Sequence, residues 1–265
     1  MTDYHNEIDP YAAQWTRNLM KRKLIPDGEV DQRDIRDVTA HDLKGFTRCH
    51  FFSGIAGWAY ALRLARVPDD YPLWTGSCPC QPFSEAGKGK GFADERHLWP
   101  AWFHLISERR PPIVFGEQVA SSDGYGWLDL VQADLEGLGY ACGASVLPAA
   151  GVGAPHGRHR IWFVAHNNPN ANSTRLERRV IKTVQERSSE RSVGTVGSRL
   201  PDSHSQPPQR SPKSRRQCHH WDVEPSMGRV ADGVPARVDK LRALGNSIVP
   251  QVAAAFIEAA LECRP

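Results

Sequence analysis

The sequence TRCHFFSGIAGWAYALRLA, residues 47–65, predicts a strand, a glycine turn and a helix in direct succession. Residues 47–52 favour the strand, Gly54 and Gly57 favour the turn, and the apolar spacing of residues 58–65 favours the helix. A glycine turn between a strand and a helix lets the backbone approach a ligand and points free N–H groups at it. Many α/β proteins carry such turns for packing alone, so this turn by itself does not establish a cofactor site.

Strand and helix patterns continue to alternate on the carboxyl side of this turn. Strands are predicted at residues 72–76, 112–119 and 160–166, and helices at residues 97–109, 128–138 and 248–263. Such alternation indicates an α/β sheet with helices on both faces.

The composition sets the class of protein. The chain has 265 residues, of which 40% are hydrophobic and 24% charged, which is enough apolar material for one sizeable core. No apolar run approaches the ~20 residues that a membrane span needs, and residues 1–10 do not resemble a signal peptide. The six cysteines lack a disulfide-like spacing. We therefore expect a cytoplasmic monomer with free thiols, with no membrane and no metal as partners.

Positive charge is concentrated in one segment. Residues 167–220 contain 11 Lys or Arg against 4 Asp or Glu, so this segment carries +7 while the net charge of the whole chain is +3. The same residues include five Pro and nine Ser but no Phe, Trp or Tyr, too few apolar side chains to form a core. Residues 167–233 are predicted to be a flexible basic insertion. It is either a solvated linker or a surface that binds phosphates.

A cysteine loop follows the strand predicted at residues 72–76. Its sequence is Cys78-Pro79-Cys80-Gln81-Pro82-Phe83-Ser84. In α/β enzymes, nucleophilic side chains commonly lie on loops at the carboxyl ends of strands, and this thiol has such a position. A zinc deaminase would need a cysteine where Phe83 stands, and a zinc knuckle would need a second cysteine pair. The flanking prolines favour exposure of Cys80, whereas Cys78 is expected to belong to the strand end.

These motifs together resemble those of the DNA cytosine-5 methyltransferase family and occur in the family's order. The matching segments are the cofactor loop at residues 52–57, the catalytic loop at residues 79–84, the Glu-Asn-Val motif at residues 116–119 with Gln118 in place of Asn, the arginine motif at residues 153–160 and the last motif at residues 245–250. The resemblance implies a Rossmann-like methyltransferase sheet and DNA as the partner. It divides the chain into an N-terminal extension (1–46), a catalytic domain (47–166), a target-recognition insertion (167–233) and a C-terminal return (234–265).

The resemblance also implies roles for single residues. Cys80 is expected to add to cytosine C6, which makes C5 a nucleophile, and Glu117 to assist at N3 as an acid. Arg160 is expected to hold the base carbonyl and Arg158 to support the loop, with the target base flipped out of the duplex. The implied cofactor-binding residues are Phe52, Ser53, Gly54, Ile55, Gly57, Asn246 and Ser247. The implied substrate-binding residues are Pro79, Gln81, Ser84, Gln118, Arg215 and Arg216.

Two departures from the family leave the one-carbon donor open. Only 27 residues separate Phe52 from Cys80, where the family places two further strand and helix elements with one acidic residue for the cofactor ribose and another for the adenine. His50 also replaces the acidic residue that opens the first motif. Either the N-terminal extension, with its acidic run from Glu29 to Asp37, covers the vacant edge, or the donor is not S-adenosylmethionine. The spacing slightly favours 5,10-methylenetetrahydrofolate, with 5-hydroxymethylcytosine as the product.

Two other classes of function fit the sequence less well. A DNA-binding protein without activity would have no use for Cys80, Glu117 and the arginines together. An enzyme acting on free nucleotides would not need the basic insertion. The sequence therefore predicts a DNA cytosine-modifying one-carbon transferase.

Overall fold

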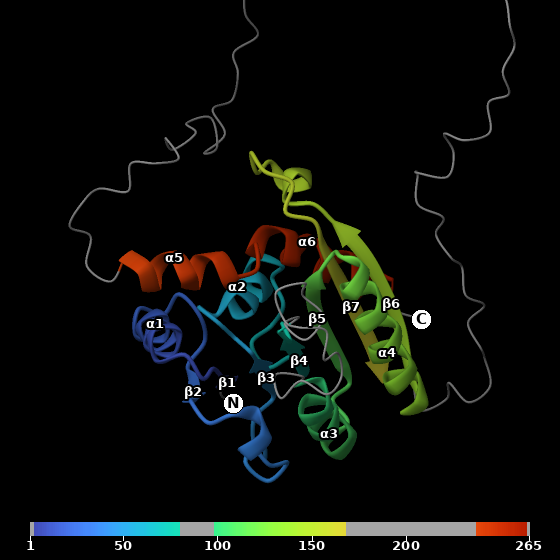
Figure 1. Cartoon of the computed structure of the whole chain (residues 1–265). Coiled ribbons are helices and arrows are strands. Elements are labelled where there is room, and N and C mark those ends of the chain that lie inside the picture. The colour runs from blue at the N-terminus through green and yellow to red at the C-terminus, as the bar shows by residue number, and fades with distance from the viewer. Residues whose placement is uncertain (1–2, 80–97, 168–236, 264–265) are drawn as a thin grey trace, which may run out of the picture.

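The computed structural model describes residues 3–79, 98–167 and 237–263, and these form one layered structure around a central sheet (Figure 1). The sheet has seven strands in the order β2-β1-β3-β4-β5-β7-β6. The neighbouring pairs from β2 to β5 are parallel, and β7 is antiparallel to both β5 and β6. The strands are β1 (Asp3–Asn6), β2 (Gly28–Asp31), β3 (Arg48–Phe51), β4 (Leu73–Gly76), β5 (Ile113–Val119), β6 (Tyr140–Leu147) and β7 (Arg160–Asn167).

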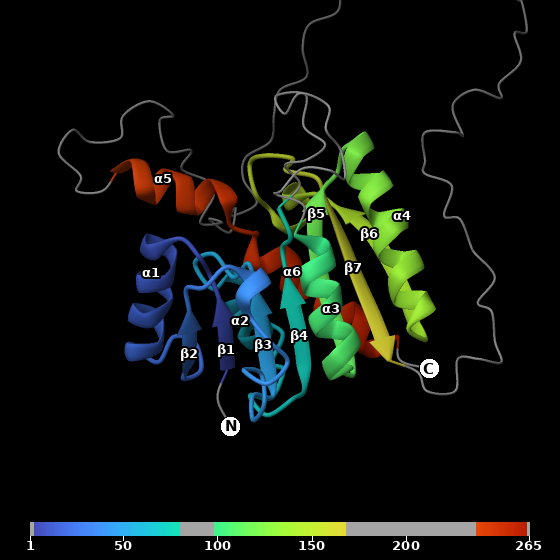
Figure 2. The same ribbon diagram turned by 60° about the horizontal axis from the view of Figure 1, so that its bottom comes forward.

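Helices cover both faces of the sheet, as the sequence predicts (Figure 2). On one face, α3 buries Trp102 against Phe51 of β3, and α4 buries Trp127 against Phe163 of β7. On the other face, α2 and α6 bury Trp58 and Ile257, and α1 packs beside α2. The helices are α1 (Pro10–Lys21), α2 (Gly57–Leu64), α3 (Trp99–Arg109), α4 (Ser122–Gly137), α5 (Arg237–Asn246) and α6 (Pro250–Glu262), with short 3-10 turns η1 (Ile35–Asp37) and η4 (Ala149–Val152).

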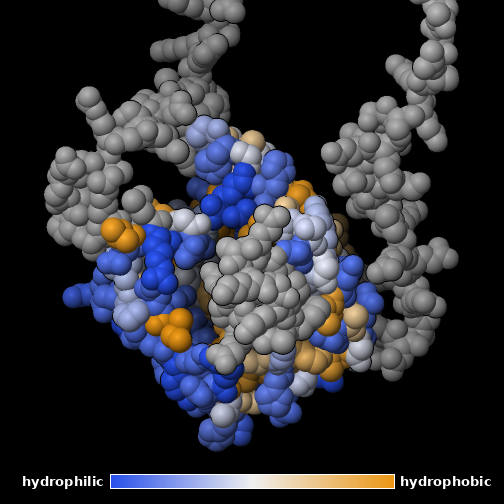
Figure 3. Space-filling model, in the orientation of Figure 1, coloured by the Kyte–Doolittle hydropathy of each residue, from blue (hydrophilic) through white to orange (hydrophobic). Residues whose placement is uncertain are grey.

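The surface is consistent with this division between core and exterior. On the face seen in Figure 1, hydrophilic residues cover most of the described surface, and apolar residues appear as small separate patches (Figure 3). The apolar stretch Val238–Glu262 is long enough to cross a membrane by length and composition. It consists of two helices, α5 and α6, and Val252, Ala253 and Ile257 of α6 are buried in the core. The burial of α6 identifies it as a core helix.

The segment before the first motif is part of the sheet itself. β1 lies between β2 and β3 and pairs in parallel with both, with Asp3 opposite Arg48 and Asn6 opposite Phe51. The segment predicted as an N-terminal extension thus contributes β1 and β2 to the sheet, in line with the alternative in which it covers the vacant edge. The two strands that the spacing between Phe52 and Cys80 leaves out are present in the sheet, because β1 and β2 supply them from earlier in the chain.

A buried ion pair joins β1 to β3. The Arg48 guanidinium donates to both oxygens of Asp3, at 2.8 and 2.9 Å, and both side chains are almost fully buried. His50 lies 3.4 Å from Asp3 and hydrogen-bonds Thr75 of β4 at 2.7 Å. Burial alone would raise the pKa of Asp3, but the hydrogen bonds and charges of His50 and Arg48 outweigh it and lower that pKa to about 2. A row of polar side chains thus crosses three strands inside the core.

Most elements predicted from the sequence are confirmed within two residues. The helix predicted at 128–138 is an exception, because α4 begins at Ser122, where the Ser121 side chain caps it by accepting from the N–H of Gly124. The two glycines in the first turn of α4 hide this start. β6 was not predicted, since its Gly143, Ala144 and Ser145 have little strand propensity.

Replacement of Arg48 by Met is expected to destabilise the fold by about 3 to 5 kcal/mol, because Asp3 is left charged and unpaired in the core. The exposed pair of Lys23 and Asp27 provides the control, and Lys23→Met is expected to cost at most ~1 kcal/mol. Urea denaturation measures both losses, and equal losses would contradict this account. Since the folded pKa of Asp3 is depressed, its contribution is present above the ordinary value of 3.8 and is lost as the pH falls toward 2.

Candidate active site

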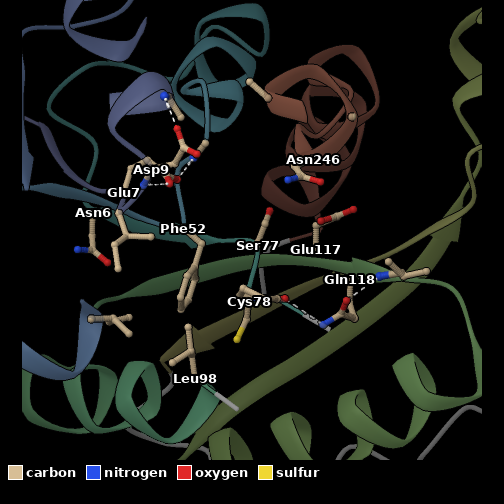
Figure 4. A pocket seen from close by; sticks show the side chains of 18 of the residues that line it. Asn6, Glu7, Asp9, Phe52, Ser77, Cys78, Leu98, Glu117, Gln118 and Asn246 are labelled. Atoms are coloured by element: carbon tan, nitrogen blue, oxygen red, sulfur yellow. Dashed lines mark hydrogen bonds between the residues drawn. The ribbon is translucent and has the colours of Figure 1, made fainter. Parts of the chain in front are cut away.

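A cavity of ≈ 880 Å³ opens where the parallel strands end (Figure 4). The chain runs from β1 to β2 in one direction across the sheet and from β3 through β4 to β5 in the other. In open α/β sheets, ligands bind outside the carboxyl ends of the strands at such a reversal. The volume lies in the range of small-molecule sites.

The loops after β1, β2 and β3 form the first wall of the cavity. Glu7 follows β1, and its carboxylate accepts hydrogen bonds from the backbone N–H of Gly54, at 2.6 Å, and of Asp9, at 2.9 Å. Burial raises the pKa of Glu7, although these two hydrogen bonds oppose the rise. Asp34 follows β2 and lines the same cavity. A half-buried carboxylate is thus fixed directly on the glycine turn.

The glycine turn has the left-handed backbone that its sequence suggests. Gly54 has a φ of +53°, and Phe52 and Ala56 also have positive φ. At Gly57 the requirement is for space, since an added Cβ would lie 2.7 Å from Ile248 and 3.3 Å from the Ser247 hydroxyl oxygen. Of the predicted cofactor-binding residues, Phe52, Gly54 and Asn246 line the cavity; Ser53, Ile55, Gly57 and Ser247 are not among its lining residues.

Glu117 and Arg160 form the opposite wall. Glu117 lies on β5, and its Oε1 is 2.9 Å from Nε of Arg160 on the neighbouring strand β7. Burial raises the pKa of Glu117, while the positive charges of Arg160 and Arg158 oppose the rise. A carboxyl group whose pKa is raised by burial is suited to act as a proton donor.

Arg158 connects two segments that are distant in the sequence. Its Nη2 donates to the carbonyl oxygens of Gly245, at 2.8 Å, and Ser247, at 2.7 Å. Its backbone has a φ of +39°, which is uncommon for a residue other than glycine. The loop before β7 is thereby tied to the junction between α5 and α6.

Gln118 contacts the backbone that leads into the cysteine loop. Its Nε2 donates to the carbonyl oxygen of Cys78, at 3.1 Å, and its Oε1 accepts from the N–H of Val119 (Figure 4). Cys78 is buried, and Pro79 is exposed and lines the cavity. The remaining predicted residues, Cys80, Gln81, Ser84, Arg215 and Arg216, lie outside the described residues.

Sequence reasoning missed Glu7 as a site residue and considered Asp34 only as part of an acidic run. The available signal was an acidic residue directly after a short strand, but β1 has only four residues, three of them polar or charged. Asp3, His5 and His50 also lie close enough to share a metal ion. Because Arg48 binds both oxygens of Asp3, we assign Asp3 to an ion pair with Arg48 and not to a metal site.

The family model for C-5 cytosine-specific DNA methylase matches residues 3–228 of the chain. Among curated proteins, the chain is 36% identical to the Type II methyltransferase M.HhaI of Haemophilus parahaemolyticus, over 62% of this chain and 42% of that protein. It is 28% identical to M.NlaX of Neisseria lactamica, over 62% of this chain and 44% of that protein. The chain therefore matches less than half the length of these relatives.

Two solved structures show a partial likeness. A mutant of DNMT2 from Spodoptera frugiperda aligns with a TM-score of 0.45 and 17% identity, over 67% of this chain and 45% of that one. Dnmt2 of S. pombe aligns with a TM-score of 0.41 and 17% identity, over 63% and 51% of the two chains.

Proposed function

The chain belongs to the C-5 cytosine-specific DNA methylase family, and we propose that it methylates carbon 5 of cytosine in DNA with S-adenosylmethionine as the donor. This proposal rests on the hydrogen bond that the Gly54 N–H donates to the Glu7 carboxylate. The cavity that holds this contact is also lined by Glu117 and Arg160. In this proposal the wall with Glu7, Asp34 and Gly54 binds the methyl donor and is called the donor wall. The wall with Glu117 and Arg160 binds the target base and is called the base wall.

The donor wall accounts for the acidic residues that the sequence spacing leaves out. The family resemblance calls for one carboxylate at the cofactor ribose and another at the adenine, on the strands beside the first motif. Here Glu7 ends the strand next to β3 and Asp34 follows the strand beyond it. We assign Glu7 to the ribose hydroxyl groups and Asp34 to the adenine amino group, with Ile8 and Ile35 supplying apolar surface in the same cavity.

The case for a folate donor depended on the absence of these carboxylates. With Glu7 and Asp34, which line the cavity from positions before the first motif, assigned to these roles, that premise no longer holds. S-adenosylmethionine therefore replaces 5,10-methylenetetrahydrofolate in this proposal. The proposed product is accordingly 5-methylcytosine and not 5-hydroxymethylcytosine.

The base wall supplies the activation of cytosine. S-adenosylmethionine, when bound, provides an electrophilic methyl group. The Cys80 thiolate is proposed to add to C6, with Glu117 protonating or hydrogen-bonding N3 so that charge does not build up on the ring. Arg160, held by its ion pair with Glu117, is proposed to hold the base carbonyl. The basic residues 167–233 stay a predicted DNA surface outside the described residues.

The donor is tested by weighing the modified nucleoside. Full-length protein incubated with unmethylated genomic DNA and S-adenosylmethionine is expected to yield 5-methylcytosine after digestion and mass spectrometry. The same DNA with 5,10-methylenetetrahydrofolate alone is expected to yield no modified cytosine. A 5-hydroxymethylcytosine signal that depends on the folate would overturn the choice of donor.

Replacement of Glu7 by Ala tests the donor wall. Loss of hydrogen bonds to a charged group costs about 1.5 to 3 kcal/mol, so the affinity for S-adenosylhomocysteine is expected to fall roughly 10- to 100-fold. Glu29→Ala is the matched control, since Glu29 is exposed on β2. Isothermal titration calorimetry measures both variants, and unchanged binding by Glu7→Ala would remove Glu7 from the site.

Replacement of Glu117 by Gln tests the base wall. It removes the acidic proton, and kcat is expected to fall about 10²- to 10⁴-fold while binding of S-adenosylhomocysteine is unchanged. Because the protonated form of Glu117 is the active one and its pKa is raised, wild-type activity is expected to decline as the pH rises through that pKa. Glu108→Gln, on the exposed side of α3, is the control. A variant with full kcat would place the acid elsewhere.

A further inference from the structure

Ser77 occupies a position between the two walls of the cavity. It directly follows β4 and stands three residues before Cys80. The indole Nε1 of Trp58, on α2, donates to the Ser77 hydroxyl oxygen at 3.0 Å. Trp58 is only 1% exposed, and its ring packs edge-on against Trp162 with centroids 5.5 Å apart. The donor to Ser77 is therefore held rigidly in the core.

The direction of this hydrogen bond determines which hydrogen-bonding group of Ser77 is left for another partner. An indole N–H is a donor only, so the Ser77 oxygen accepts from Trp58 and its own O–H remains free to donate. Ser77 and Glu117 lie side by side at the cavity (Figure 4), and Ser77 is among the groups that oppose the rise in the pKa of Glu117. The charged groups that face Glu117 are Arg160 of β7 and Arg158 of the preceding loop. Glu117 is thus held between one hydroxyl group and one guanidinium group.

We propose that Ser77 is a positioning residue for Glu117, and that the chain from Trp58 through Ser77 to Glu117 orients this carboxyl group toward the target base. The inference rests on the proposed function, because it takes Glu117 as the acid at N3. Trp58 directly follows Gly57 of the glycine turn. The series of side chains Trp58, Ser77 and Glu117 therefore connects the donor wall to the base wall.

Loss of the Ser77 hydroxyl has two separable effects. The Glu117 carboxylate loses a donor that stabilises its charged form, so the pKa of Glu117 rises further above its usual range. The carboxyl group also loses its orientation, so turnover falls even where Glu117 is fully protonated. A residue with a merely structural role would change the amount of folded protein without moving the pKa of Glu117.

The test compares Ser77→Ala, Ser77→Thr and Ser107→Ala. Ser77→Ala is expected to lower kcat about 10-fold, to leave the KM for S-adenosylmethionine unchanged and to move the alkaline limb of the pH profile upward. Ser77→Thr, which keeps the hydroxyl group, is expected to restore both kcat and the profile. Ser107 bonds a backbone carbonyl on α3, and Ser107→Ala is expected to change neither. Trp58→Phe is expected to lower kcat and shift the pH profile as Ser77→Ala does. The double variant of Trp58→Phe and Ser77→Ala is expected to lower kcat little further.

A measurement without turnover separates this inference from the proposed function. The pKa of Glu117 is followed by carbon NMR of the side-chain carboxyl group in the wild type, Ser77→Ala and Ser77→Thr. An upward shift in Ser77→Ala alone supports the inference, whether or not the protein methylates DNA. An unchanged pKa in Ser77→Ala overturns it, even if the wild type produces 5-methylcytosine.

Discussion

The buried ion pair between Asp3 and Arg48 determines where the donor wall of the cavity is built. It joins two adjacent strands whose paired residues are 45 positions apart in the sequence. Because Asn6 is then opposite Phe51, Glu7 emerges beside the turn that begins at Phe52 and meets Gly54. A shift of one residue would turn Asp3 to the opposite face of the sheet, away from Arg48, and move Glu7 away from this turn. The ion pair, the register and the site therefore depend on one another.

The arrangement of the strands in space matters more to the chemistry than their order in the chain. β1 and β2 precede the first motif, yet they lie beside β3, on the side where the family resemblance calls for the ribose and adenine carboxylates. The base wall comes from β5 and β7, with Glu117 paired to Arg160. Trp58 and Ser77 lie between these parts and are joined to each other by a hydrogen bond. In the proposed function, a donor site and a base site thus share one cavity.

The sequence was informative where the signal is local. The glycine turn, β5 with Glu117 and the amphipathic α6 all follow from short-range patterns. β1 was missed because Asp3, His5 and Asn6 look like surface residues until Arg48 and His50, far along the chain, are placed beside them. The folate hypothesis rested on the same missing information, since it counted the residues between two motifs and did not include strands that come earlier in the chain. The contacts of Ser77 and Gln118 join separate strands and loops, and no spacing rule reveals them.

The central claim is that residues before the first motif form the donor half of the site. A crystal structure of the full-length protein with S-adenosylhomocysteine tests it most directly. The account predicts the ribose at the Glu7 carboxylate and the adenine near Asp34 and Ile35, at the ends of β1 and β2. A nucleoside bound without contact to any residue between β1 and η1 would contradict it.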